Sequence, residues 1–290
     1  MRRRSTRLKP ALVALLTVGM SAVGLAQWIH YPTPDIPRTG DGKPNLTAPA
    51  PKLADGKPDL SGTWRGNPRR CVSATGQTVP CGVEIGGSPL GGNLGRELPG
   101  GLPYKPEVAE MVRKRRADFS RDDPHVRCLP DSAVRMWTLP HLTKIIHTPK
   151  LLAILYEVNA QYRQIFIDGR PFPDDPTPSW IGYSVGHWEG DTLVVTTKGF
   201  RDDIWIDSNG SPLSGKATMT ERLHRVNFGT MDLEITIDDP TNYTKPFTVK
   251  QTEFFEADTE LIDEFCLENE KSYDRMQRSR SADTPPPARP

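Results

Sequence analysis

The part of the sequence that most constrains the fold begins at Met136, where short apolar or β-branched runs alternate with turn residues. Two hairpin signatures lie between the later runs, at residues 189–191 (EGD) and 228–230 (FGT). Within Met231–Ile237, apolar and polar residues alternate strictly, which is typical of a strand with one wet face. Because no helical pattern separates the runs, a parallel α/β fold is disfavoured. The expected strands are residues 144–147, 151–157, 162–167, 181–188, 192–198, 219–227, 231–237, 247–256 and 261–267.

A meander of this size favours a closed sheet, because closure removes unpaired strand edges. We therefore predict an all-β fold, an antiparallel β-barrel of about eight strands with an irregular N-terminal extension and one helix. The helix is expected from Pro106, a favoured residue at a helix start, to about Phe119. At the entry of the first strand, Gly62-Thr63-Trp64 resembles the Gly-x-Trp of lipocalin-like barrels, in which the tryptophan closes one end of the barrel.

The N-terminus has the features of an export signal. Five basic residues and no acidic residue precede an apolar stretch, residues 11–25, that is too short to span a bilayer. Cleavage is expected after Ala26, by either the Sec or the twin-arginine route, and the mature chain is expected in the periplasm or outside the cell. The predicted divisions are a signal peptide (1–26), a proline-rich linker (27–60), a disulfide-clipped irregular segment with one helix (61–135), the barrel (136–272) and a disordered tail (273–290).

Charge and cysteine content narrow the functional classes. The chain has 37 basic and 36 acidic residues, and removal of the signal takes away only basic ones, so a nucleic-acid partner is disfavoured. Four cysteines fit an oxidising compartment. Of the three possible pairings we predict Cys71–Cys81, which closes a Gly/Pro-rich loop, with Cys128–Cys266. No Cys-x-x-Cys pair and no third ligand beside His187 and Glu189 support a metal site, so no metal or cofactor is expected.

Several long segments are similar to a large family of exported bacterial proteins of unknown function. The resemblance covers residues 58–271 and implies secretion and a β-rich domain. It implies no particular activity, cofactor or substrate. The segments that carry it are RQIFIDGRPFPDDPTPSWIGYSVGHWEGDTLVV (163–195), ERLHR (221–225), TIDDPTNYTKPFTV (236–249) and CLENEK (266–271).

Strand parity gives the first candidate for chemistry. Glu221 shares a strand face with Met219 and Leu223, and if that face points inward the carboxylate lies among apolar groups. Burial would raise its pKa and suit it to general acid or base catalysis. The alternative is a structural ion pair with an arginine such as Arg225.

Two further candidates lie on the strand expected at residues 181–188. Tyr183 and His187 share a face with each other, so a barrel lined by Tyr183, His187 and Glu221 could bind a small molecule or move a proton on it. The alternative places His187 in solvent near the hairpin. Aromatic and cationic residues of the same region are the candidate ligand-binding groups: Arg163, Arg170, Trp180 and Trp188.

Three functional hypotheses follow. The first is an exported protein that binds a small, partly apolar molecule inside the barrel. The second is a cofactor-free isomerase, lyase or hydrolase that uses Glu221 with Tyr183 or His187. The third is a cell-envelope interaction module whose proline-rich arm meets a partner.

Overall fold

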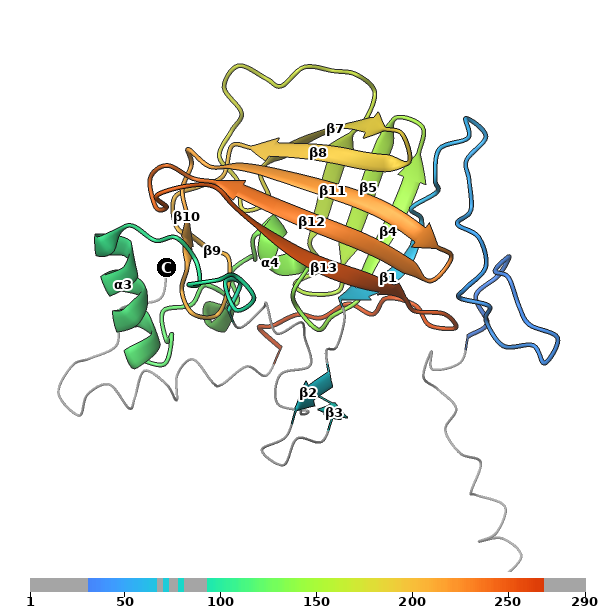
Figure 1. Cartoon of the computed structure of the whole chain (residues 1–290), viewed down its shortest axis with the longest axis horizontal. Coiled ribbons are helices and arrows are strands. Elements are labelled where there is room, and N and C mark those ends of the chain that lie inside the picture. Colours follow the sequence, from blue (N-terminus) through green and yellow to red (C-terminus); the bar gives the residue numbers. More distant parts are fainter. Residues whose placement is uncertain (1–30, 67–69, 73–77, 81–92, 269–290) are drawn as a thin grey trace, which may run out of the picture.

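The computed structural model describes residues 31–66, 70–72, 78–80 and 93–268. Within these residues, nine strands form a closed barrel in the order β1-β13-β12-β11-β8-β7-β6-β5-β4 (Figure 1). The strands are β1 (Gly62–Gly66), β4 (Thr143–Thr148), β5 (Leu151–Tyr156), β6 (Tyr162–Phe166), β7 (Tyr183–Glu189), β8 (Thr192–Lys198), β11 (Thr218–Asn227), β12 (Thr230–Asp238) and β13 (Phe247–Phe255).

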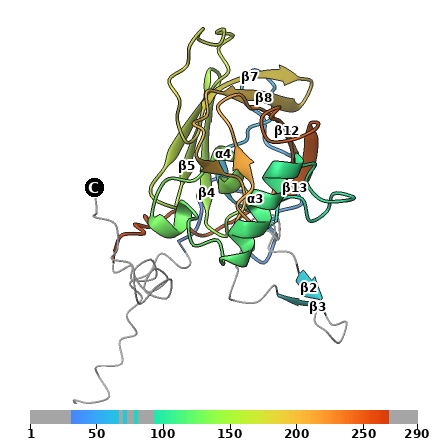
Figure 2. The same cartoon turned by 90° about the vertical axis from the view of Figure 1, so that its left-hand side faces the viewer.

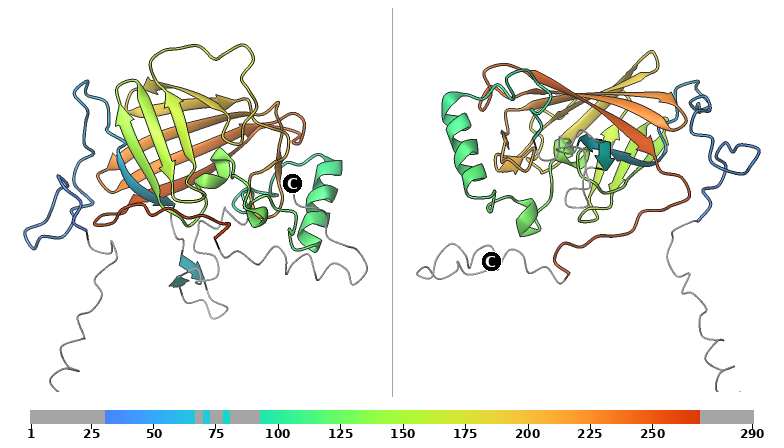
Figure 3. Two further views of the ribbon diagram at one scale, coloured as in Figure 1. Left: turned by 180° about the vertical axis from the view of Figure 1, so that it is seen from behind. Right: turned by 60° about the horizontal axis from the view of Figure 1, so that its bottom comes forward.

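The prediction of an all-β barrel is confirmed, but two of its details need correction. The barrel has nine strands because β1 enters it between β13 and β4, so the closed sheet is not confined to residues 136–272. It is also mixed, since β6 and β7 pair in parallel at Ile165–Ser184 and Phe166–Val185. Parallel neighbours need a long crossover. The 16 residues between these strands supply it, in a loop that stands out from the barrel (Figures 1 and 3).

The prediction of a strand at residues 261–267 is wrong. The last barrel strand ends at Phe255, and the following chain makes only a single bridge, between Glu264 and Val158. Asp258, with φ 57°, turns the chain, and its carboxylate accepts hydrogen bonds from Arg38 and from the main-chain N–H of Thr33. The segment therefore runs along the barrel instead of adding to its sheet.

The elements outside the barrel are small. Helix α3 (Pro106–Ala117) starts at the predicted proline and ends two residues before Phe119. It stands beside the short pair β9 (Ile204–Trp205) and β10 (Pro212–Leu213), whereas α4 (Ala133–Met136) lies at the mouth of the barrel (Figure 2). The remaining elements are a 3-10 turn, η1 (His125–Arg127), and the pair β2 (Arg70–Val72) and β3 (Thr78–Pro80). None of the described helices is long and apolar enough to cross a membrane.

The tryptophan of the Gly-x-Trp tripeptide is part of the core. Trp64 is fully buried, and its ring meets Phe255 edge-on at 5.6 Å. The guanidinium of Arg225 lies 4.8 Å from the Trp64 ring and donates to the carbonyl oxygens of Phe228 and Asp59. Arg225 is thus occupied with backbone and aromatic groups, and it is not the partner of Glu221.

The proline-rich arm, described from residue 31, packs against the barrel. Its repeat DGKP-x-L forms the same small turn twice, with bridges Arg38–Pro44 and Lys52–Pro58. Each turn needs a left-handed residue, which Gly42 (φ 83°) supplies in the first copy and Gly56 (φ 81°) in the second. Residues 46–48 then accept hydrogen bonds from the β11–β12 hairpin. The described part of the arm therefore lacks helices and strands, as predicted, but it packs against the barrel.

One of the two predicted disulfides is confirmed. Cys128 and Cys266 are bonded, with their Cα atoms 5.3 Å apart, and the bridge joins the chain after η1 to the segment after β13. The predicted Cys71–Cys81 bridge, the signal peptide (1–26) and the tail (273–290) lie outside the described residues.

Candidate functional site

The interior of the barrel holds a buried ion pair. The side chains of Arg163 and Glu221 are both fully buried. The Arg163 guanidinium donates two hydrogen bonds to the Glu221 carboxylate, from Nη1 to Oε1 at 2.8 Å and from Nη2 to Oε2. Trp137 Nε1 donates to Glu221 Oε1 at 2.6 Å. The remaining guanidinium donors reach Ser184 Oγ at 3.1 Å and Thr197 Oγ1 at 2.8 Å. Because the buried charges are held by hydrogen bonds from four strands and Trp137, the cluster links β6, β7, β8 and β11.

Glu221 is therefore inward-facing, as parity predicts, and paired, as the alternative interpretation expects. Its partner is Arg163 and not Arg225. A carboxylate that is held by a guanidinium and an indole is poorly placed to take a proton from a ligand. The structure thus gives Glu221 and Arg163 a structural role inside the barrel.

A second buried carboxyl lies beside this cluster. Glu253 is 1% exposed, and burial raises its pKa to about 8. Gln251 Nε2 donates to Glu253 Oε1 and to the carbonyl oxygen of Trp137. The Tyr156 hydroxyl is also buried, next to the Arg163 guanidinium, and burial raises the pKa of Tyr156. Parity on β13 could have identified Glu253, but the sequence analysis did not single it out.

The raised pKa of Glu253 predicts a pH-dependent stability. The folded state binds a proton more tightly than the unfolded state, whose glutamate has a pKa near 4.5, so the stabilising effect of protonation is complete below pH 4.5 and is lost as the pH rises towards 8. We expect Glu253→Gln to be more stable than the wild type at pH 8 by up to about 4 kcal/mol, and nearly equal to it at pH 5. Urea unfolding at both pH values measures this, and an identical pH profile for the two proteins would contradict it.

Tyr183 and His187 do share a strand face, but that face points out of the barrel. The inward residues of β7 are Ser184 and Gly186, both fully buried or nearly so. His187 is exposed and lies 3.3 Å from Glu189, as the solvent-side interpretation expects. The predicted catalytic set of Glu221, Tyr183 and His187 is therefore not brought together. A side chain at residue 186 would collide with Ile167, 2.9 Å away, so the inward face of β7 has to be small there.

Tyr183 instead lines a cavity of about 510 Å³ on the outer wall of the barrel, at the seam between β6 and β7. We call it the seam cavity. Two of the predicted ligand-binding residues, Arg163 and Trp180, also belong to its wall, although the Arg163 guanidinium points into the barrel. Its complete lining is Pro130, Asn159, Ala160, Gln161, Tyr162, Arg163, Gln164, Phe166, Ser179, Trp180, Ile181, Gly182 and Tyr183.

Aromatic rings and cations form one rim of the seam cavity. Tyr183 stacks on Phe166, with ring centroids 5.3 Å apart. The Arg170 guanidinium lies 3.8 Å from the centre of the Phe166 ring and 3.5 Å from the Tyr183 hydroxyl, and Asp168 pairs with it at 2.7 Å. Arg170 is thus adjacent to the cavity, as the prediction of a ligand-binding role requires. The hydrogen bonds that Arg170 donates to the Asp168 carboxylate raise the pKa of Arg170 further above its usual range.

The fourth predicted ligand-binding residue, Trp188, lies elsewhere. Its ring is 5.8 Å from that of His147, and the Lys57 ammonium lies 5.8 Å from its centre. The first contact joins β7 to β4, and the second joins β7 to the docked arm. Trp188 therefore packs the arm and does not contribute to the seam cavity.

The seam is open because the chain before β7 pairs with a different neighbour. Ser179 forms a parallel bridge with Phe200, and its main-chain groups bond to Gly199 and Arg201. Gly182, with φ 73°, then turns the chain into β7, and a Cβ at this position would meet Thr197 at 2.7 Å. β7 therefore joins β6 only at Ile165, and the first residues of β6 are left without a strand on that side.

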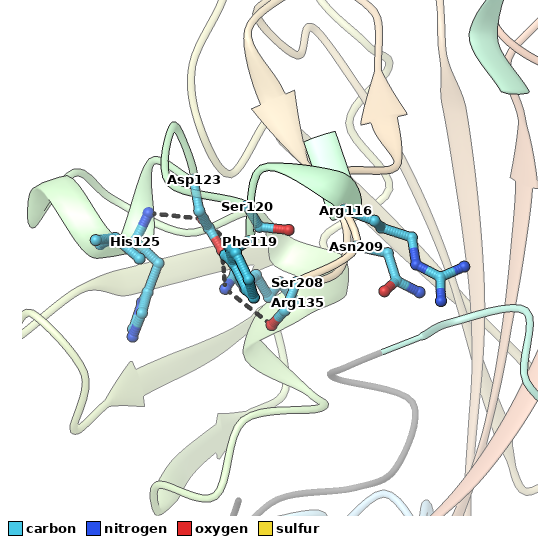
Figure 4. Close-up of a pocket in the computed structure, with 9 residues that line it drawn as sticks. Arg116, Phe119, Ser120, Asp123, His125, Arg135, Ser208 and Asn209 are labelled. Atoms are coloured by element: carbon cyan, nitrogen blue, oxygen red, sulfur yellow. Dashed lines mark hydrogen bonds and ion pairs between the residues drawn. The ribbon is translucent and has the colours of Figure 1, made fainter. Parts of the chain in front are cut away.

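A second cavity, of about 410 Å³, lies between the end of α3 and residues 208–209 (Figure 4). Its floor is a buried pair in which Arg135 donates to both carboxylate oxygens of Asp123, at 2.6 and 2.8 Å. The His125 ring turns away from these side chains in the figure, and Asp131, 2.7 Å from its Nδ1, raises the pKa of His125. Since Asp123 and Asp131 neutralise Arg135, this network fixes the segment between α3 and α4. Nothing in the sequence pattern signalled it.

Neither metal-ligand geometry among the described residues nor similarity to a known protein assigns a function. Among the described residues, no group of three or more His, Cys, Asp or Glu side chains is arranged to hold a metal ion. No known family model, curated protein or solved structure matches the chain. The geometry of the seam cavity therefore carries the functional argument.

Proposed function

We propose that this protein is an exported binding protein for a small, partly apolar molecule, and that the molecule binds in the seam cavity. The observation that carries the proposal is the wall of that cavity, in which Tyr162, Phe166, Trp180 and Tyr183 surround a few amide side chains. Binding sites for small molecules are typically concave, mostly apolar and 300–1,000 Å³ in volume, with a small number of polar groups that orient the ligand.

The proposal moves the ligand from the barrel interior to the barrel wall. The interior positions around Glu221 are filled by Arg163 and Trp137. The seam cavity is open to the surface, and its aromatic lining consists of the exposed Tyr162 and the half-buried Phe166, Trp180 and Tyr183. An oxidising compartment fits the Cys128–Cys266 bridge. The closed barrel and the buried Trp64 also support the lipocalin-like architecture that we propose.

The proposal predicts different effects for two tryptophans at opposite ends of β7. With 1-anilinonaphthalene-8-sulfonate as the fluorescent probe, Trp180→Ala should raise the Kd at least tenfold, because the ring forms part of the cavity wall. Trp188→Ala removes the same kind of side chain outside the cavity and should leave the Kd within twofold. Thermal melting of both variants checks that they fold. Equal effects of the two substitutions, or no effect of Trp180→Ala, would reject the seam cavity as the binding site.

A further inference from the structure

The first residues of β6 present unpaired main-chain groups to the seam cavity. Tyr156 N donates to Gln161 O, so Gln161, Arg163 and Ile165 direct their main-chain groups to β5. By the alternation of the ladder, the N–H groups of Tyr162 and Gln164 point to the other side. There β7 pairs with β6 only from Ile165 onward, so among the described residues neither N–H has a partner strand on that side.

These two donors have the spacing of a strand edge. Residues two apart on one side of a strand are about 6.6 Å apart, which matches the spacing of successive acceptors in another extended chain. Trp180 and Gly182, on the opposite wall of the cavity, would continue the parallel pairing if β7 did not turn away. The gap therefore has the form of a missing strand between two existing ones.

A third polar group of the cavity wall also lacks a partner. Asn159 Nδ2 is buried without an acceptor among the described residues. Asn159 (φ 54°) and Ala160 (φ 47°) are both left-handed, an uncommon conformation for residues other than glycine, and both residues of this turn line the cavity.

We infer that the seam cavity binds a short peptide in extended conformation, which adds to the edge of β6 through the N–H groups of Tyr162 and Gln164 and places an aromatic or bulky apolar side chain against Tyr183 and Trp180. This inference rests on the proposed function and names its ligand class. The main-chain groups supply binding and register, and the aromatic wall supplies side-chain preference. A two- or three-residue peptide matches the length of the open edge.

The test compares a blocked tripeptide, acetyl-Ala-Phe-Ala-amide, with the same probe used above. Gln164→Pro removes the N–H at a strand edge, where proline is tolerated, and Gln164→Ala removes the side chain but keeps the N–H. We expect Gln164→Pro to raise the Kd of the tripeptide at least tenfold and Gln164→Ala to change it less than threefold. The Kd of 1-anilinonaphthalene-8-sulfonate should change by the same factor in both variants, because both remove the Gln164 side chain from the cavity wall and the probe has no peptide groups to pair with the N–H.

A change on the ligand side keeps the test independent of folding. Three analogues each replace one amide of the tripeptide by an ester, which removes an N–H donor and weakens the neighbouring carbonyl acceptor. At least one analogue should bind three- to tenfold more weakly to the wild-type protein. Equal binding of all three analogues, or no tripeptide binding while the fluorescent probe still binds in a Trp180-dependent way, would overturn the peptide inference and leave the proposed function standing. Failure of both ligands to bind would overturn both.

Discussion

Glu221→Gln should destabilise the protein by about 3–5 kcal/mol at neutral pH. The substitution removes the charge that compensates Arg163, whose side chain is fully buried, and an unpaired buried cation is much more costly than a buried pair. The glutamine can still accept a hydrogen bond from Trp137, so the loss reports the charge more than the shape of the side chain. Urea or guanidinium unfolding, with the m-value checked for constancy, measures the effect.

An exposed ion pair between β7 and β11 provides the control. Glu189 lies 2.9 Å from Arg222 with half of its side chain in solvent, so Glu189→Gln should leave the free energy of unfolding nearly unchanged. In a double-mutant cycle, Arg163→Met with Glu221→Met should cost less than the sum of the two single changes. A Glu221→Gln variant as stable as the wild type would show that the carboxylate is not the counter-charge of Arg163.

The second large effect concerns the disulfide between Cys128 and Cys266. The bridge spans 138 residues, and a loop of this length restricts the unfolded chain strongly, so the stabilisation expected from chain entropy is about 5 kcal/mol. The double variant Cys128→Ser with Cys266→Ser should therefore lose about 2–5 kcal/mol relative to the oxidised wild type. Guanidinium unfolding without reductant measures the loss.

A thiol reductant distinguishes the contributions of the two predicted bridges to stability. Added to the double variant, a thiol reductant can act only on the remaining cysteines, so a further fall in stability would report the predicted Cys71–Cys81 bridge. Unchanged unfolding midpoints for the wild type and the double variant would contradict a stabilising role for the Cys128–Cys266 bridge, which would then only fasten an already ordered segment to the barrel.

Local pattern accounts for much of the barrel. Strict alternation in β12 and the turn residues of its hairpin define strands that the structure reproduces to within one or two residues, because side-chain period and turn chemistry are local properties. Alternation likewise placed Glu221 on the buried face with Met219 and Leu223. The strand expected at residues 261–267 failed because an apolar run does not by itself supply a neighbour with which to pair.

By itself, the sequence determined the all-β class, the set of residues that share each strand face, and the cysteines able to form bridges. Only the tertiary structure decided which face of β7 points inward, because its buried residues, Ser184 and Gly186, are less apolar than the outward Val185. It alone matched Arg163 with Glu221, since the two residues meet across the barrel and their 58-residue separation leaves no local signal. The open seam has the same origin: whether the edge of β6 finds a partner depends on where the crossover returns, which long-range packing sets.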